Sequence, residues 1–585
     1  MGRQCHLAWF LCAVGLGSTV AAAPQPEPRR PNVLVILTDD MGHGDLGVHG
    51  NPVIKTPHLD RLAHESVRLT RFFVSPVCSP TRSSLLTGRY NYRTRIVDTF
   101  NGRSMMDPAE VTLAEMLGGS GYRTGIFGKW HLGDCYPMRP IDQGFQEALV
   151  LRGGGIGQPS DPPGGTSYFD PVLQHNGKPE KCAGYCSDVY TDAAIDYIQK
   201  GRSDARPFFV YLAFNCPHDP LEVPESYRLK YSGADLSNAR FPQAGHPMAG
   251  PINADATARL YGMVTNIDDN VGRLLARLDE LGLARDTIVL FLTDNGPAFP
   301  RYVSGMRGLK GTVYDGGIRV PAFLRWAGKL PAGREVDRIV AHIDVVPTLL
   351  EACGVARPEG VTLDGVSLWP LVTGRVDAAA WPDRTLFFQW HRGDAPERFR
   401  AFAARGQKFK LVRAEGATAP VPPAFELFDV EADPFELHDI AAARPEVVAR
   451  LKRAYSEWFD DVSRGRGYDP PRIHLGSPRE NPTTLTRQDW RGPRAGGPDP
   501  LGYWEVDVER PVRVNVSLTL RPPRGASVAH LKLGKTSRAK PLEAGATTCV
   551  FEAVDLAAGP GRLEAWVDLP GATHGVWSVE VQQRD

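Results

Sequence analysis

The sequence predicts an α/β fold built on a large, doubly wound mixed sheet. Two observations lead to this prediction. Short apolar runs recur along the N-terminal half of the chain, as expected for strands that are buried on both faces of a sheet. Helix-like stretches separate these runs, such as residues 255–281, where apolar side chains recur at helical spacing. Strands that alternate with helices form layered α/β domains.

The predicted strands of this sheet cover residues 32–37, 122–127, 208–214 and 287–292. Each run is followed by polar side chains, which are Asp39 with Asp40, Lys129 with His131, Asn215 with His218, and Asp294 with Asn295. Ligands of doubly wound sheets bind at the carboxyl ends of the strands, so we expect these side chains to meet at one edge. Solvated loop charges would explain one such cluster but explain four poorly.

The chain of 585 residues is long enough for several domains. Residues 31–380 are predicted to form the main α/β domain. A smaller α+β subdomain is expected at 381–467, with short strands and an amphipathic helix at 445–462. Residues 468–510 are rich in Pro, Gly and Arg and are predicted to be a linker. Residues 511–585 contain alternating segments separated by Gly and Pro, which predict an all-β appendage.

The N-terminus has the features of a cleaved secretory signal peptide at residues 1–23. Arg3 precedes an apolar run that begins at Leu7, and three alanines end the segment at Ala23. A membrane anchor is the alternative, but the run is short for a span and no other long apolar segment follows. We therefore expect an exported protein, periplasmic or extracellular, with no transmembrane segment after cleavage.

Charge and cysteine content narrow the expected partners. Lys plus Arg equals Asp plus Glu at 67 each, so nothing in the composition suggests a nucleic-acid partner. Two of the nine cysteines, Cys5 and Cys12, lie in the predicted signal peptide. The remaining number is odd, so at least one cysteine stays unpaired. A small or locally recognised substrate is expected.

The acidic groups predict a cation site. Oxygen ligands suit Ca²⁺ or Mg²⁺ rather than zinc or copper, and they are offered here by Asp39, Asp40, Asp294 and Asn295. Adjacent carboxylates buried at a strand end would repel each other, and a bound cation relieves that repulsion. Surface exposure of Asp39 and Asp40 is the alternative, which the second cluster at an equivalent strand end disfavours.

Basic groups predict that a tetrahedral oxyanion binds beside the cation. Arg82 offers a planar set of donors, and Lys129 and Lys310 supply point charges. The helix-like segment that starts after Cys78 adds backbone N–H groups.

Two histidines are candidate proton-transfer groups, because the ordinary pKa of histidine is near neutral. They are His131 and His218. A single histidine is more often structural, but these two follow strands that should converge on one edge of the sheet.

Residues 78–89 resemble a family motif. Cys78-Ser79-Pro80-Thr81-Arg82, followed by Leu86-Thr87-Gly88-Arg89, is similar to the maturation motif of type I sulfatases, a family of the alkaline phosphatase-like superfamily that includes arylsulfatases. Further resemblances follow in the family's order, at LTDDMGHGDLG (37–47), GYRTGIFGKWHLG (121–133), FLTDNGP (291–297), GLKGTVYDGGIRVP (308–321) and HIDVVPTLL (342–350). Together they cover most of residues 31–460.

The resemblance implies an alkaline phosphatase-like fold, a catalytic domain at 31–380, and hydrolysis of aryl sulfates or sulfated carbohydrates. A formylglycine-generating enzyme would oxidise Cys78 to Cα-formylglycine, whose hydrate carries two hydroxyls on one carbon. One hydroxyl would attack the sulfur of the ester and become covalently sulfated. The other would drive collapse to the aldehyde with release of sulfate.

The resemblance also implies a role for each matched residue. The implied Ca²⁺ ligands are Asp39, Asp40, the modified Cys78, Asp294 and Asn295. Arg82 would stabilise the hydrate, Lys129 would hold the sulfate, and Asp294 would help to deprotonate the attacking hydroxyl. His131 would be the base for sulfate elimination, while His218 and Lys310 would assist the leaving-group oxygen.

The chain departs from the family in two places. Asp315 stands where many relatives carry Glu, and no sulfate-contacting polar residue can be aligned between Gly144 and Gly165. Residues 153–165 are expected to form a substrate-facing loop, with a flexible connector as the alternative.

Two other functions stay open at this point. One is hydrolysis of phosphate or phosphonate monoesters, which the same superfamily includes. The other is a non-catalytic glycan-binding protein that retains the fold and binds through its β appendage. The complete set of matched polar residues argues against the second.

Overall fold

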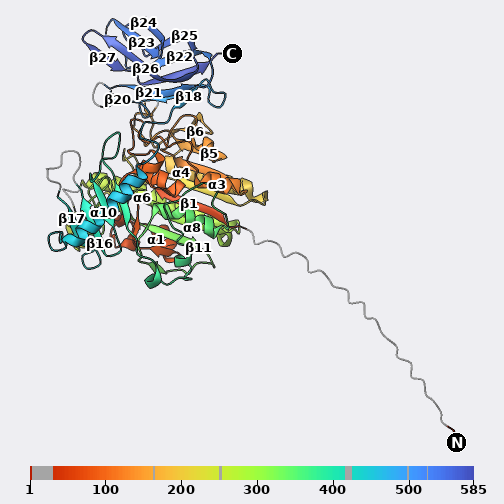
Figure 1. Ribbon diagram of the computed structural model, residues 1–585, viewed down its shortest axis with the longest axis vertical. Coiled ribbons are helices and arrows are strands. Elements are labelled where there is room, and N and C mark those ends of the chain that lie inside the picture. Colours follow the sequence, from red (N-terminus) through yellow and green to blue (C-terminus); the bar gives the residue numbers. More distant parts are fainter. Residues whose placement is uncertain are drawn as a thin grey trace.

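The computed structural model describes residues 1–2, 30–161, 165–248, 253–414, 424–496, 500–523 and 525–584. The signal peptide predicted at 1–23 lies outside the described residues, except for its first two. A large α/β body occupies the centre of the molecule, and a β-rich module lies at one end of it (Figure 1). Among the helices described, none is long and apolar enough to cross a membrane.

The body is built on one ten-stranded sheet. Its strands, in spatial order, are β12 (Glu335–Val336), β2 (Val67–Leu69), β11 (Ala322–Trp326), β9 (Thr287–Thr293), β1 (Asn32–Thr38), β8 (Phe208–Ala213), β4 (Arg123–Lys129), β5 (Glu147–Leu151), β6 (Val172–His175) and β7 (Lys178–Lys181). The five strands from β9 to β5 run parallel, while β11 and β6 pair antiparallel with their neighbours. The predicted mixed sheet and its four predicted strands are therefore confirmed.

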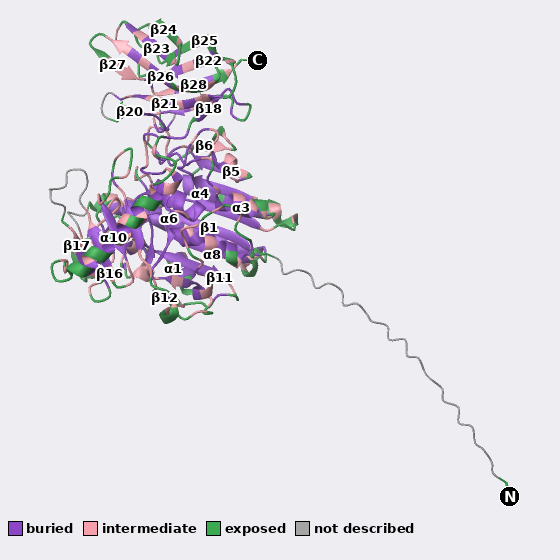
Figure 2. Ribbon diagram, in the orientation of Figure 1, coloured by how far each residue is buried: buried purple, intermediate pink, exposed green. Residues whose placement is uncertain are grey.

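Both faces of this sheet are buried. Along β1, Val33, Val35 and Leu37 pack into one hydrophobic cluster, and Leu34 and Ile36 pack into another. The first cluster includes residues of α2 (Cys78–Thr87), α3 (Leu113–Gly119) and α8 (Val345–Ala352), and the second includes residues of α1 (Pro57–His64), α4 (Cys186–Lys200) and α6 (Ala254–Glu280). Figure 2 shows the buried strands inside the body. This two-sided burial explains the continuous apolar runs in the sequence.

The register of the central strands brings the polar segments together. Thr38 at the end of β1 pairs with Thr293 at the end of β9, so Asp39 and Asp294 follow at equivalent positions. β8 lies on the other side of β1, and β4, which ends at Lys129, lies beyond it. Four polar strand ends therefore meet at one edge of the sheet.

A smaller α+β subdomain follows the body, as predicted. Its antiparallel sheet contains β14 (Leu386–Gln389), β15 (Phe402–Arg405), β16 (Phe409–Arg413) and β17 (Glu426–Asp429), and α10 (Pro445–Val462) packs in the same hydrophobic cluster. The Lys410 ammonium joins it to the body through a 2.6 Å contact with Asp315, and it also lies 2.6 Å from Glu436 of the same subdomain. Asp315, the departure noted in the sequence, is thus a buried ion-pair residue between the two parts.

The C-terminal β module begins earlier than the sequence predicts. Four strands lie in the segment 468–510, where a linker is expected, and they are β18 (Ile473–Leu475), β19 (Thr483–Thr486), β20 (Arg491–Arg494) and β21 (Leu501–Val508). They pair with β22 (Val512–Thr519), β23 (Ser527–Leu533), β24 (Thr536–Leu542), β25 (Thr548–Leu556), β26 (Gly559–Leu569), β27 (Ala572–Gly575) and β28 (Ser578–Gln583) in sheets of seven and four strands. Alternate residues of β21 are buried in the core between the sheets. This burial favours strands here although the segment is rich in Pro and Gly.

This module is packed onto the body. Its hydrophobic core includes Met105, Cys135 and Met138 of the body alongside Trp490 and Trp504 of the module. Among the described residues, the other short strands and α-helices are β3 (Phe72–Phe73), β10 (Arg319–Val320), β13 (Val340–Ala341), α5 (Glu225–Arg228), α7 (Asp315–Ile318) and α9 (Trp369–Val372).

Candidate active site

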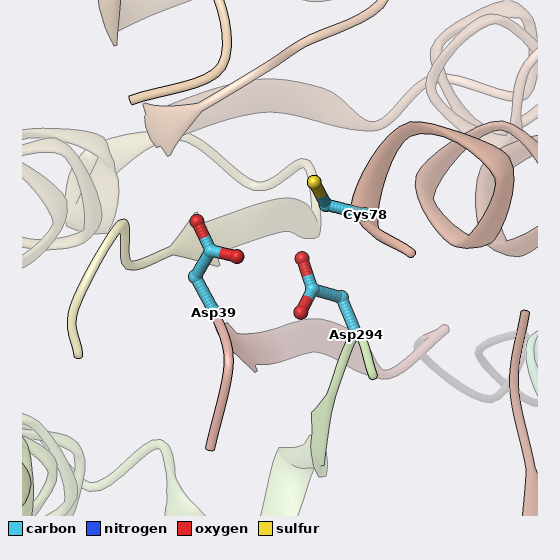
Figure 3. Close-up of side chains that lie close together, drawn as sticks. All are labelled: Asp39, Cys78 and Asp294. Carbon is cyan, nitrogen blue, oxygen red and sulfur yellow. The ribbon is translucent and has the colours of Figure 1, made fainter. Parts of the chain in front are cut away.

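Three side chains from different elements point toward one another at the edge of the sheet (Figure 3). Asp39 follows β1, Asp294 follows β9, and Cys78 is the first residue of α2. One ligand atom from each, a carboxylate oxygen or the sulfur, lies within 4.8 Å of the other two. All three residues are buried. The strand register and the start of the helix thus build a compact centre from residues far apart in the chain.

Asp40 and Asn295 complete the acidic centre. The backbone of Asp40 has φ of 59°, a left-handed conformation that is uncommon outside glycine and is found at functional sites. This turn places its N–H 3.2 Å from Oδ1 of Asp294. The amide of Asn295 donates to Oδ1 of Asp40 at 2.7 Å. The structure therefore brings together all five residues expected to bind a metal.

The donors of this centre fit a hard cation. Oδ1 of Asp39 and Oδ1 of Asn295 are buried and have no hydrogen-bond partner among the described residues. Burial, reinforced by the charge of Asp39, raises the pKa of Asp294 to about 7. Unpaired buried oxygens and repelling carboxylates are costly, and a cation that accepts oxygen ligands relieves both costs. Calcium or magnesium suits this set of ligands.

Two lysines lie against the carboxylates of this centre, Lys129 fully buried and Lys310 with its side chain 20% exposed. Lys129 lies 2.6 Å from Oδ2 of Asp39, and Lys310 lies 2.6 Å from Oδ1 of Asp40. Lys310 and His218 keep the pKa of Asp40 below its ordinary value, although burial alone would raise it. The two lysines expected to hold an anion are therefore paired with carboxylates of the acidic centre.

Arg82 occupies the same face of α2 as Cys78, because residues four apart in a helix are neighbours. Its Nε and Nη2 donate to Oδ2 of Asp294 at 3.1 and 2.8 Å, and its Nη1 donates to the carbonyl of Lys129 at 2.8 Å. The helix ends at Thr87, and Gly88, with φ of 69°, forms the left-handed cap after it. The motif thus places the cysteine and the guanidinium one helical turn apart.

His131 follows β4 with a left-handed φ of 60°. Its Nε2 lies 2.7 Å from the carbonyl oxygen of Thr99, and its buried Nδ1 has no partner among the described residues. Burial and the nearby ammonium of Lys129 lower its pKa well below the ordinary value. The ring is therefore neutral near pH 7 and has one nitrogen free to accept a proton.

His218 follows β8, the strand between β1 and β4. Its Nε2 lies 3.8 Å from Oδ2 of Asp40, and its Nδ1 lies 2.8 Å from the carbonyl oxygen of Asp219. Burial lowers its pKa despite the opposing charge of Asp40. The Tyr168 hydroxyl lies 2.6 Å from the His218 carbonyl oxygen and fixes this turn.

Two protein-family models match the sequence of this chain. Residues 31–355 match the family model described as Sulfatase, and residues 309–459 match the model described as N-sulphoglucosamine sulphohydrolase, C-terminal. The chain belongs to the sulfatase family. Sulfatases are sulfuric ester hydrolases, so the predicted family, fold class and reaction class are confirmed.

Individual sulfatases are also similar to this chain in sequence or in structure. The chain is 32% identical over 422 residues to N-acetylgalactosamine-6-sulfatase of Sus scrofa, a stretch covering 66% of this chain and 72% of that protein. It is 32% identical over 497 residues to arylsulfatase A of Homo sapiens, covering 76% and 89%. The solved structure of Ps i-CgsB in complex with k-i-k-neocarrahexaose is 26% identical, with a TM-score of 0.62 and coverage of 75% and 95%.

Asn215 follows a predicted strand, but reasoning from the sequence assigned it no role. Both of its side-chain polar atoms are buried without a partner among the described residues, two positions after the end of β8. The loop expected to face the substrate packs on the histidines: a Cβ built on Gly154 would lie 2.4 Å from the ring of His131, and one on Gly155 would lie 3.3 Å from that of His218. Residues 162–164 of this loop lie outside the described part of the chain.

Proposed function

We propose that this sulfatase works through a formylglycine made from Cys78 and a bound calcium ion, with magnesium as the alternative. The observation that carries the proposal is the position of Cys78. Its sulfur lies within 4.8 Å of carboxylate oxygens of Asp39 and Asp294, and the next turn of its helix supplies Arg82. A nucleophile at this position has both the cation ligands and the anion-binding groups within reach.

The cation would be held by Asp39, Asp40, Asp294, Asn295 and the oxygen that replaces the Cys78 sulfur. A formylglycine hydrate supplies two hydroxyls on one carbon, one to attack sulfur and one to expel sulfate, and a dication beside it favours the ionised hydroxyl. Asp294, with a carboxylate oxygen within 4.8 Å of the Cys78 sulfur, would take up the proton of the attacking hydroxyl. Burial of α2 keeps bulk water away from the reacting atoms.

The charges of the site favour an anionic ester once a dication is bound. Three carboxylates, Asp39, Asp40 and Asp294, face three cations, Arg82, Lys129 and Lys310. These formal charges cancel, so a dication leaves the site with excess positive charge that attracts the sulfate group. In this assignment Arg82 stabilises the hydrate and Lys129 holds the sulfate oxygens.

The two histidines would divide the proton transfers. His218, with Lys310 on the same carboxylate of Asp40, donates a proton to the ester oxygen as the alcohol leaves. The negative charge of a bound sulfate ester favours the protonated ring that this step requires. His131, through its free Nδ1, accepts the proton of the remaining hydroxyl when sulfate is expelled.

Sulfated carbohydrates are the substrate class that we propose. Support comes from relatives, since one is named N-acetylgalactosamine-6-sulfatase and one solved neighbour is a complex with a neocarrahexaose. Phosphate or phosphonate monoester hydrolysis is the alternative reaction, and glycan binding without catalysis is the alternative class of function. No contact within the described site favours either alternative.

Export is also part of the proposal. The N-terminal residues have the composition of a secretory signal peptide, which supports a location in the periplasm or outside the cell. The proposed modification requires a formylglycine-generating enzyme as a partner during maturation. Burial raises the pKa of the Cys78 thiol, which disfavours spontaneous reaction of this cysteine as a thiolate.

The test compares sulfate with phosphate release from paired aryl esters, using protein produced with a formylglycine-generating enzyme. We expect sulfate release, its loss in Cys78→Ala, and its retention in Cys353→Ala, a control at another buried free cysteine. Preferential phosphate release would move the assignment to the phosphohydrolases. A protein that carries the aldehyde but releases neither anion, from aryl esters or from sulfated oligosaccharides, would contradict the catalytic proposal.

A further inference from the structure

Gln488 belongs to the C-terminal β module, yet its side chain reaches the active site of the body. It lies in the turn between β19 and β20 and is 1% exposed. Its Nε2 donates to the carbonyl oxygen of Thr99 at 2.8 Å and lies 3.3 Å from the hydroxyl of Ser104. The same nitrogen lies 3.5 Å from Nε2 of His131. A residue of the module therefore contacts the peptide that holds the histidine.

The carbonyl oxygen of Thr99 joins the two side chains. It lies 2.7 Å from Nε2 of His131 and 2.8 Å from Nε2 of Gln488. A carbonyl oxygen only accepts hydrogen bonds, so Nε2 of the neutral imidazole must carry the hydrogen. Nδ1 is then the nitrogen with a free lone pair. The two nitrogens at 3.5 Å are both donors to one oxygen and form no hydrogen bond with each other.

The peptide of Thr99 needs external support, because it lies in no helix or strand. The module supplies part of that support through its backbone as well, since the N–H of Gly102 donates to the carbonyl of Gln488 at 2.9 Å. A second support comes from Asp98, whose buried carboxylate accepts from the indole of Trp390 at 3.0 Å. His131 itself has a left-handed backbone, a conformation that surrounding contacts must hold.

We propose that Gln488 is a positioning residue for His131. By holding the carbonyl of Thr99, the β module keeps the imidazole in the tautomer whose hydrogen is on Nε2 and presents Nδ1 to the reacting groups. This inference rests on the proposed role of His131 as the base in sulfate release. It gives the module a part in catalysis that does not require it to touch the substrate.

The first measurement is the tautomer of His131, read from the side-chain nitrogen signals of the full-length protein labelled with ¹⁵N-histidine. His131→Gln identifies the signal. We expect a single tautomer with hydrogen on Nε2 in the wild type, and a mixture in Gln488→Leu, which keeps the side-chain volume but has no donor. Gln488→Asn, whose amide is one methylene shorter and cannot reach Thr99, should give the same mixture if the leucine variant fails to fold.

The second measurement is turnover of an aryl sulfate. Loss of a group that orients a functional side chain typically costs tenfold to a hundredfold, so we expect kcat of Gln488→Leu to fall by about that factor with little change in KM. The control is Asn515→Ala, which removes the side-chain oxygen that accepts a 3.1 Å hydrogen bond from the backbone N–H of Ala553 within the same module. Its kcat should match that of the wild type.

The two measurements separate this inference from the proposed function. An unchanged His131 tautomer in both Gln488 variants, or an equal loss of kcat in Asn515→Ala, would overturn the positioning role. The tautomer is measured without turnover. A shifted tautomer in a protein that releases no sulfate would therefore uphold the positioning of the ring and contradict the proposed function instead.

Discussion

The guanidinium of Arg82 donates two hydrogen bonds to one carboxylate oxygen of Asp294, at 3.1 Å from Nε and 2.8 Å from Nη2. Both side chains are fully buried. The pair joins the start of α2 to the end of β9 and so fixes Cys78 relative to the acidic centre. Removing one partner of a buried pair leaves an uncompensated charge, which is far more costly than the loss of a surface pair.

Arg82→Met should therefore lower the free energy of unfolding by about 3 to 5 kcal/mol in calcium-free buffer, as measured by urea denaturation. The control is Arg68→Met, which removes a pair with Glu335 whose side chains are 24% and 56% exposed. That change should cost about 1 kcal/mol or less. Equal losses in the two variants would contradict the structural role assigned to Arg82.

Calcium should stabilise the protein through the acidic centre. At a concentration about a hundredfold above Kd, a cation that binds only the folded state adds about 2.7 kcal/mol, which appears as a rise in Tm. Asp39→Asn should abolish this rise. Asp269→Asn, in a separate group with His58 and Asp268, should retain it. A rise that survives in Asp39→Asn and disappears in Asp269→Asn would place the cation at the other group.

His218→Ala should reduce turnover in proportion to how poor the leaving group is. A general acid matters little for nitrophenolate, which leaves as a stable anion, and contributes about a hundredfold or more for an alkyl alcohol. The measurement is kcat/KM on a series of sulfate esters of increasing alcohol pKa. His175→Ala, which alters a half-exposed pair with Glu147, is the control. Equal losses across the series would remove His218 from the acid role.

Asp489 should make the protein less stable as the pH rises. Burial and the charge of Asp134 raise its pKa well above the ordinary 3.8. The folded protein therefore keeps a proton that the unfolded chain releases above about pH 4, so this group's contribution to stability declines from that pH up to the raised pKa.

Asp489→Asn removes this dependence, so its advantage over the wild type should grow by up to about 1.4 kcal/mol per pH unit within that window. Urea denaturation at about pH 4, 5.5 and 7 measures it. Glu552→Gln, at an exposed position of the same module, is the control. An advantage that stays constant with pH would show that the carboxyl of Asp489 is ionised in the folded protein.

Much of the centre follows from simple patterns in the sequence. Parallel strands that end in polar residues must bring those residues to one edge, which is why Asp39, Lys129, His218 and Asp294 meet as expected. The helix at 255–281 was equally clear, because α6 combines its length with a continuous apolar face.

Other features depend on contacts that no local pattern encodes. β15 (Phe402–Arg405) is a four-residue strand with two alanines, and it is recognisable only beside β14 and β16. The strands in 468–510 are interrupted by Pro and Gly at their turns, which resembles a linker in composition. The pairing of Lys129 and Lys310 with carboxylates also depends on three-dimensional packing, as does the contact of Gln488 with Thr99.

The hydrogen bond from Gln488 to Thr99 spans 389 positions of the chain. A nascent polypeptide that has emerged only as far as α10 already contains every residue of the acidic centre, but not the turn that holds the peptide beneath His131. Contacts this distant in sequence form late, because the loop they close costs the most entropy. With Gln488 in the proposed positioning role, full hydrolytic competence follows only after the turn between β19 and β20 has docked on the body.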